Sequence, residues 1–244
     1  MPRYIPRDTF LRLSRSSAGE VLFPRLERLC YHIEETDVPP SHFHLFFPPR
    51  LKIFALYRVS SVPSDQVAVL VHIISFLTNS LHGLTLKFYG QRREPLLEDA
   101  MSSFVCRHGS LLRHFGSDIP LSEAATHHLM QLPNLRFWVA TQKPPRTLPP
   151  VAFPSLESLH LQSAALPWLH LLASHKNNDI QSGFSPPTSR ANLRETLKFL
   201  DCPRGTVIDS TFSSSVANFW NLVGLRVGEC CSGTEGCISQ PNRR

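Results

Sequence analysis

Six cysteines and twelve histidines are the residues of this chain that could ligate a metal or serve a nucleophilic reaction. Cys230, Cys231 and Cys237 form one local group, and Cys106 with His108 forms another. A structural zinc site needs four ligands, commonly in closely spaced pairs. Neither group has a second pair at a suitable spacing. We therefore expect reduced, free thiols and no bound metal.

The motifs of common enzyme classes are missing from the sequence. It contains no G-x-S-x-G nucleophile elbow, no Walker A loop, no G-x-G-x-x-G and no H-E-x-x-H. Only 11 of the 244 residues are glycine, so loops that cradle phosphates have little to be built from. We predict that the chain is not an enzyme and binds neither a cofactor nor a small-molecule substrate.

Basic residues outnumber acidic ones, for a formal net charge of +6 and a sequence pI near 9.2. Such a surface can attract RNA or an acidic protein. The basic residues are spread along the chain, with only short pairs such as Arg92-Arg93 and Arg243-Arg244. No RNP motif, basic helix or zinc finger is present. This distribution favours a protein partner over nucleic acid, and a basic RNA-associated scaffold remains the alternative.

An L-x-x-L-x-L pattern recurs along the chain and indicates the elements that would position these side chains. It often follows a Phe-Pro or Leu-Pro pair. Its first residues are Leu26, Leu51, Leu81, Leu112, Leu135, Leu156 and Leu222, with a degenerate copy expected within Leu193–Leu200. Most spacings lie close to the roughly 20–29 residues of leucine-rich repeats. The pattern therefore predicts a stacked array, which is typically a binding surface.

Each copy is expected to form a short strand, because the fourth and sixth positions point to the same side of a strand and can be buried together. The residues between them should face outward on a concave sheet. Aromatic and arginine side chains are typical anchors of protein interfaces. The resulting candidates for partner binding are Arg28, His32, Tyr57, Lys87, Asp118, Phe137, His160 and Arg226.

Helices are expected between several of these strands. Apolar residues at helical spacing mark 64–79, 94–107, 121–131 and 165–175, and Ser64 and Ser122 are candidate N-caps. Strands that alternate with helices predict an α/β fold with a parallel sheet. The predicted architecture is an irregular, right-handed leucine-rich-repeat solenoid with outer helices. An ordinary α/β domain with leucine-rich strands is the alternative.

Composition sets the expected organisation of the chain. Residues 1–21 form a basic N-terminal capping segment, 22–231 the solenoid with a loop excursion at 176–190, and 232–244 a disordered tail. No run of about 18 apolar residues predicts a membrane span, and no secretory signal is present. Together with the scattered cysteines, this favours an intracellular protein of the cytoplasm or nucleus.

Four segments, LFPRLERLCYHIEE, LPNLRFWVA, FPSLESLHL and NFWNLVGLRVGECCSGTEGC, resemble the leucine-rich-repeat part of F-box-like proteins from mushroom-forming (basidiomycete) fungi. Together they span about Glu20 to Cys237. In that family an N-terminal F-box docks on the adaptor of an SCF ubiquitin ligase, and the repeats recruit a substrate. No F-box is readable before Leu22, and the last repeat breaks off near Pro241, where relatives would continue.

The predicted function is therefore a non-enzymatic protein-interaction module, similar to the substrate-recognition part of an F-box ubiquitin-ligase receptor. The resemblance implies two partners, the SCF adaptor and a substrate protein. It assigns no individual binding residue. A truncated, non-functional fragment of such a protein is a further alternative.

Overall fold

The structure is a computed structural model of the chain. It describes residues 12, 21–33, 43–58, 64–77, 80–88, 94–149, 152–162, 167–174, 196–202, 210–217, 219 and 221–227. The expected capping segment lies outside these residues apart from Arg12 and Val21, and the excursion at 176–190 and the tail at 232–244 lie outside them entirely.

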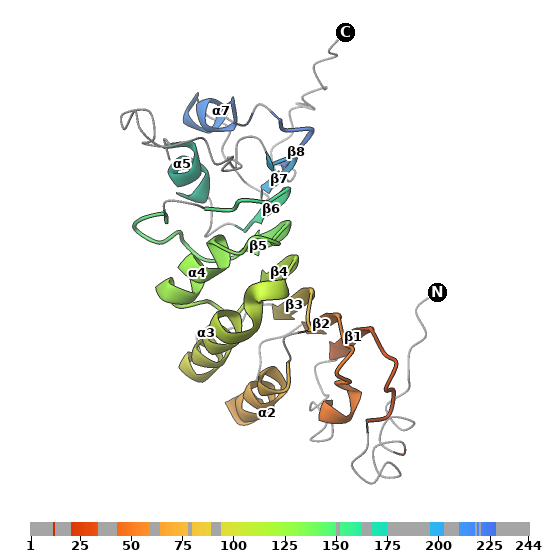
Figure 1. Ribbon diagram of the computed structural model, residues 1–244. Coiled ribbons are helices and arrows are strands. Elements are labelled where there is room, and N and C mark those ends of the chain that lie inside the picture. The colour runs from red at the N-terminus through yellow and green to blue at the C-terminus, as the bar shows by residue number, and fades with distance from the viewer. Residues whose placement is uncertain are drawn as a thin grey trace, which may run out of the picture.

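Among these residues, eight strands form one parallel sheet in strict sequence order (Figure 1). The strands are β1 (Arg28–Ile33), β2 (Ile53–Arg58), β3 (Gly83–Phe88), β4 (His114–Ser117), β5 (Phe137–Ala140), β6 (Ser158–Leu161), β7 (Phe199–Cys202) and β8 (Gly224–Val227). The expected α/β class with a parallel sheet is confirmed. A degenerate copy is also present, as Leu197-x-x-Leu200-x-Cys202, which overlaps the expected segment Leu193–Leu200 but extends beyond it to the end of β7.

Side chains of the same position in each strand stack into rows across the sheet. The fourth position of the pattern is continuous from β1 to β8 and consists of Leu29, Phe54, Leu84, Phe115, Trp138, Leu159, Leu200 and Leu225. From Phe54 to Leu200 these side chains are at most 2% exposed. Burial of one such side chain stabilises the fold by about 1.5–3 kcal/mol.

Five described helices lie on one side of this sheet (Figure 1): α2 (Ser64–Ser75), α3 (Pro95–His108), α4 (Glu123–Met130), α5 (Pro167–Ser174) and α7 (Ser210–Ala217). The four predicted helices are confirmed within a few residues at each end. Between β1 and β2 the structure has a 3-10 turn, η1 (Phe43–Phe46), and a second, η2 (Gly109–Leu111), follows α3. Helix α7 was not expected, because the sequence STFSSSVA has weak helical propensity.

The ends of the helices follow from local sequence. Ser122 caps α4 as predicted, since its Oγ accepts a hydrogen bond from Ala125 N–H at 3.2 Å. Helix α3 begins with Pro95, which has no N–H to leave unpaired at a helix start. Its apolar face, with Leu97, Met101 and Phe104, is buried in the hydrophobic core, and the helix packs between α2 and α4. The Ser64 side chain, which was predicted to cap α2, lies outside the described part of the structure.

The Phe-Pro and Leu-Pro pairs have a structural role before the strands. Leu156 N–H donates to Phe153 O, and Leu26 N–H donates to Phe23 O, so each leucine ends a tight turn that begins at the phenylalanine of a Phe-Pro pair. Phe153 is completely buried, between Trp138 and Trp168. Its φ of 58° lies in the left-handed region, which bulky residues rarely adopt.

Candidate functional site

The outward face of the sheet carries the residues that the sequence proposed for partner binding. Register places Arg28 in a row with Phe137, and Arg226 in a second row with His160. His32, Tyr57 and Lys87 form a third row at the ends of β1 to β3. The eight predicted residues are therefore distributed over the whole face, and the structure brings them together only in smaller groups.

The first group lies on β1 and β2. The His32 and Tyr57 rings are stacked, with centroids 4.9 Å apart. Cys30 Sγ lies 3.7 Å from His32 Nε2. Burial raises the pKa of the Cys30 thiol, so it stays protonated at neutral pH and is a poor nucleophile. This end of the face offers flat aromatic surface rather than a reactive thiol.

The second group surrounds Asp118, which directly follows β4. Its carboxylate accepts hydrogen bonds from Phe88 N–H at 2.9 Å and from Gln162 Nε2 at 3.1 Å, and it forms an ion pair with Lys87 at 3.4 Å. The side chains of Lys87 and Asp118 are only 19% and 13% exposed. These interactions join β3, β4 and β6, so Asp118 contributes mainly to holding the face together.

The third group is an aromatic track across β4 to β6. The Phe137 ring lies 6.0 Å from the His114 ring and 4.7 Å from the His160 ring. His160 Nδ1 is 3.0 Å from Asp201 Oδ2 on β7. The pKa of His114 is lowered, first by burial and then by the positive charges of Arg113 and Arg136. The track is thus aromatic, with a positive field at its β4 end.

Sequence reasoning missed two outward residues, Phe199 and Asp201, because the copy in β7 was too degenerate to align. Phe199 is 49% exposed and lies beside Gly224, whose missing side chain leaves room for its ring. The pattern Leu197-x-x-Leu200-x-Cys202 would have identified both, since cysteine is a small apolar residue that can replace the last leucine.

A further row was missed altogether, at the second position of the repeat, immediately before each strand. We call it the start row: Glu27, Lys52, His82, Arg113, Arg136, Glu157, Lys198 and Val223. From Glu27 to Lys198, each carbonyl oxygen accepts two hydrogen bonds, from the next start-row N–H and from the N–H that follows it, at 2.7–3.0 Å. This ladder holds the charged side chains at one strand spacing, about 4.8 Å, from one another.

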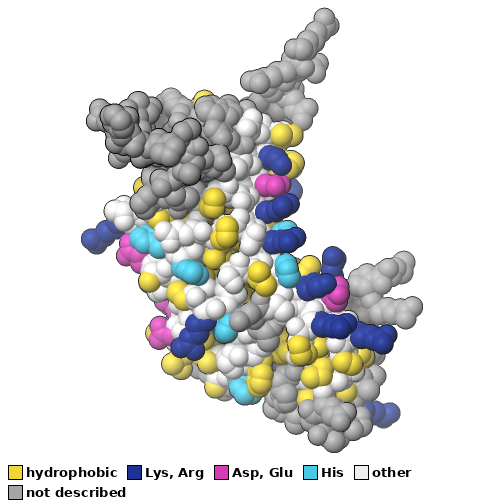
Figure 2. Space-filling view, in the orientation of Figure 1, with side chains coloured by type: hydrophobic (Ala, Val, Ile, Leu, Met, Phe, Trp, Pro, Cys, Tyr) yellow, Lys and Arg dark blue, Asp and Glu magenta, His cyan; other side chains and the backbone are white. Residues whose placement is uncertain are grey.

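The start row carries both signs of charge, with four Lys or Arg side chains and two Glu side chains. Glu27 pairs with Lys52 at 2.8 Å, and this hydrogen bond and charge lower the pKa of Glu27. Glu157 pairs with Lys198 at 3.4 Å and lies 3.9 Å from Arg136. Figure 2 shows Lys and Arg side chains following the margin of the molecule on the strand side, with few acidic side chains between them. The margin is therefore predominantly basic.

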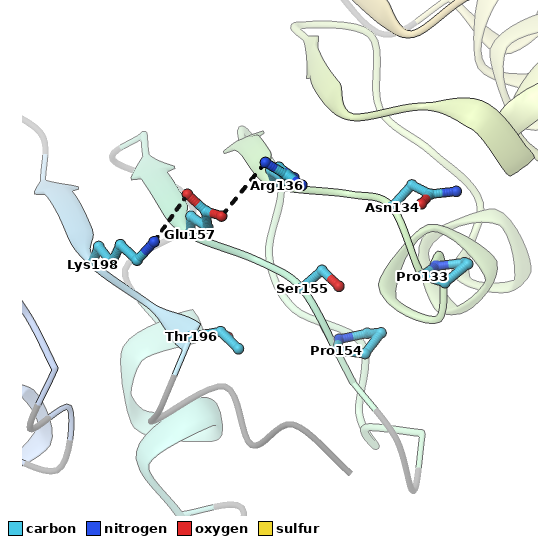
Figure 3. A pocket seen from close by; sticks show the side chains of 8 residues that line it. All are labelled: Pro133, Asn134, Arg136, Pro154, Ser155, Glu157, Thr196 and Lys198. Carbon is cyan, nitrogen blue, oxygen red and sulfur yellow. Dashed lines mark ion pairs between the residues drawn. The ribbon is translucent and has the colours of Figure 1, made fainter. Parts of the chain in front are cut away.

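A shallow groove of about 270 Å³ runs along the start row at β5 to β7. Arg136, Glu157 and Lys198 line it, together with the residues two positions earlier in each turn, which are Asn134, Ser155 and Thr196 (Figure 3). Pro133 and Pro154 complete the lining and stiffen it. The groove thus combines two cations and one carboxylate with amide and hydroxyl groups.

A second depression, of about 550 Å³, lies at the other ends of β4 and β5, against α3 and α4. Gln142 connects the segments that line this depression. Its Oε1 accepts a hydrogen bond from Leu121 N–H, and its Nε2 donates one to Thr126 Oγ1, both at 2.6 Å. Glu98 Oε1 is buried there and has no hydrogen-bond partner among the described residues. Such an oxygen destabilises a fold by about 1–3 kcal/mol.

Within the described residues, no three His, Cys, Asp or Glu side chains come together as metal ligands would. The Cys230–Cys237 group lies outside that part of the chain. None of the helices described here is both long and apolar enough to cross a bilayer. Comparison with protein-family models and with curated protein sequences finds no match to this chain.

Proposed function

We propose that the chain is an irregular leucine-rich-repeat solenoid that binds a protein partner through the outward face of its sheet. The observation that carries this proposal is the unbroken register of eight parallel strands, with the described helices all on the opposite side (Figure 1). Such a face displays side chains in rows over a long surface, which suits the recognition of an extended or large partner.

The chemistry of the face supports a protein partner. The stacked His32 and Tyr57 and the track through Phe137 provide rigid aromatic area, and Arg28 and Arg226 are exposed cations at its two ends. Protein interfaces are enriched in aromatic residues and arginine, and a few such anchors supply most of the binding energy. By resemblance to F-box-like proteins, we propose that the partner is a ubiquitin-ligase substrate, with the SCF adaptor as a second partner.

The test is affinity capture of the tagged protein from fungal cell lysate at about 0.3 M salt, which suppresses phosphate contacts with nucleic acid. The face variant is Phe137→Ser with Arg226→Glu. The matched control, Leu96→Ser with Arg107→Glu, makes the same changes at exposed positions of α3. Lys87 is left intact because its reversal would place two carboxylates together at Asp118.

We expect a discrete set of proteins to be captured by the wild type and the α3 control and to be lost from the face variant. Thermal unfolding of the purified proteins checks that the two variants are equally folded. Equal capture by both variants would refute recognition through this face. Recovery of the SCF adaptor would connect the chain to a ubiquitin ligase.

A further inference from the structure

Two arginines on neighbouring strands leave an uncompensated positive charge in the start row. Arg136 N–H donates to Arg113 O at 2.8 Å, so the two residues occupy equivalent positions immediately before β4 and β5. Glu157, on the far side of Arg136, is shared with Lys198. Among the described residues, Arg113 has no ion pair. Like charges in neighbouring positions of a sheet are destabilising, so a further anion beside Arg113 would stabilise this pair.

The positive charge of the two guanidinium groups affects the neighbouring His114 side chain. Both contribute, after burial, to the lowered pKa of His114, which is the first ring of the aromatic track through Phe137. The pair therefore lies where charged and apolar contacts with one ligand can be made together. The groove at Arg136 adds the amide of Asn134 and the hydroxyl of Ser155 within the same lining.

We infer that Arg113 and Arg136 together bind a carboxylate of an acidic, extended peptide segment in the protein partner. This inference rests on the proposed function and names the chemistry that the face selects. Guanidinium groups recognise carboxylates through paired, charge-assisted hydrogen bonds, and two of them on adjacent strands can hold one carboxylate from both sides. An apolar residue next to that carboxylate would contact Phe137.

The distribution of charge along the row favours a peptide over nucleic acid. The positive stretch is two residues wide, with Glu157 on one side and His82 on the other. A nucleic-acid backbone carries a charge at every nucleotide and binds best to a continuous basic surface. Here its next phosphates would approach Glu157. A peptide with one or two carboxylates fits the row without that repulsion.

The binding test uses three fluorescent probes of defined composition: hexaglutamate, hexaglutamine and hexauridylate. Fluorescence anisotropy at about 0.05 M salt measures their affinity for the wild type, for Arg113→Gln with Arg136→Gln, and for Arg107→Gln with Arg146→Gln. The last variant removes the same charge from exposed positions outside the start row. We expect hexaglutamate to bind, hexaglutamine not to bind, and only the start-row variant to lose about tenfold or more in affinity.

A second readout follows His114 by NMR and does not depend on affinity. Removal of both guanidinium groups should raise the pKa of His114, because their charge disfavours the protonated ring. Hexaglutamate should raise it in the wild type for the same reason. A His114 pKa that does not respond to hexaglutamate would place the bound peptide elsewhere and overturn the inference.

The remaining outcomes separate this inference from the proposed function. Equal loss of hexaglutamate binding in both variants would indicate general attraction to a basic protein and overturn the specific pair. Tighter, arginine-dependent binding of hexauridylate would overturn the peptide in favour of nucleic acid. If the start-row variant still captures the partner that the Phe137 and Arg226 variant loses, the inference fails while the proposed function stands.

Discussion

Phe153→Gly is expected to destabilise the fold less than Phe153→Ala, whereas glycine is usually the more destabilising of the two residues. The residue is completely buried, and its ring centroid lies 5.1 Å from that of Trp138 and 6.3 Å from that of Trp168. Its backbone is in the left-handed region, at φ 58°. Both substitutions remove the ring, but only glycine adopts this conformation without steric cost.

The expected magnitudes follow from these two features. Loss of the buried ring should cost about 3–5 kcal/mol in either variant. Alanine in a left-handed conformation costs about 1–2 kcal/mol more. Glycine loses more backbone entropy on folding, by about 0.5–1 kcal/mol. Phe153→Gly should therefore be more stable than Phe153→Ala by about 0.5–1 kcal/mol.

Phe115 provides the matched control, since it is a phenylalanine only 2% exposed in the ordinary extended backbone of β4. There, the glycine variant should be less stable than the alanine variant by about 0.5–1 kcal/mol. Urea unfolding followed by far-UV circular dichroism measures all four free energies. If glycine is the less stable variant by the same margin at both positions, the left-handed conformation of Phe153 is wrong.

Three further substitutions test local features. Ser122→Ala should destabilise the protein by about 1 kcal/mol through loss of the α4 cap, whereas Ser103→Ala at an exposed position of α3 should be nearly neutral in the same urea titration. Gln142→Ala should cost about 1–3 kcal/mol, because it leaves buried polar groups unpaired; no change in the thermal midpoint would contradict its bridging role. Burial, and then the charge of Asp201, raises the pKa of Cys202 to about 12. Native Cys202 should therefore resist alkylation at mildly alkaline pH, as peptide mass spectrometry can show. Because the folded state holds this proton more tightly, the free energy of unfolding should fall as pH rises from 9.0 toward 12, and less so in Cys202→Ala.

The parallel sheet could be predicted because the information that specifies it is local. A strand needs only alternating apolar residues, and seven copies of one pattern at similar spacing imply strands in the same orientation. Helix α3 could also be predicted, since Leu97, Met101 and Phe104 recur at helical spacing. Helix α7 and the 3-10 turn η1 were not, because tertiary packing rather than propensity or periodicity determines them.

For the candidate site, the sequence predicts which individual residues face outward but not which of them contact one another. Alternation placed Lys87 and His160 on the outward face, but it could not pair them with Asp118 and Asp201, because those partners lie on neighbouring strands. The start row was missed for a different reason. Alternation was followed only within each strand, whereas residues such as Arg113 precede the strand and are aligned by backbone hydrogen bonds across the sheet.

Each start-row carbonyl oxygen from Glu27 to Lys198 accepts two backbone hydrogen bonds, and these bonds also determine where the chain tolerates insertions and deletions. They fix the beginning of each strand against its neighbour, although β5 and β6 are separated by far fewer residues than β6 and β7. An insertion between two strands enlarges only the helical side. An insertion within a strand turns every following side chain to the opposite face, so Phe137 would exchange places with Trp138. The helical layer can therefore be lengthened, shortened or tagged while the outward face keeps its composition.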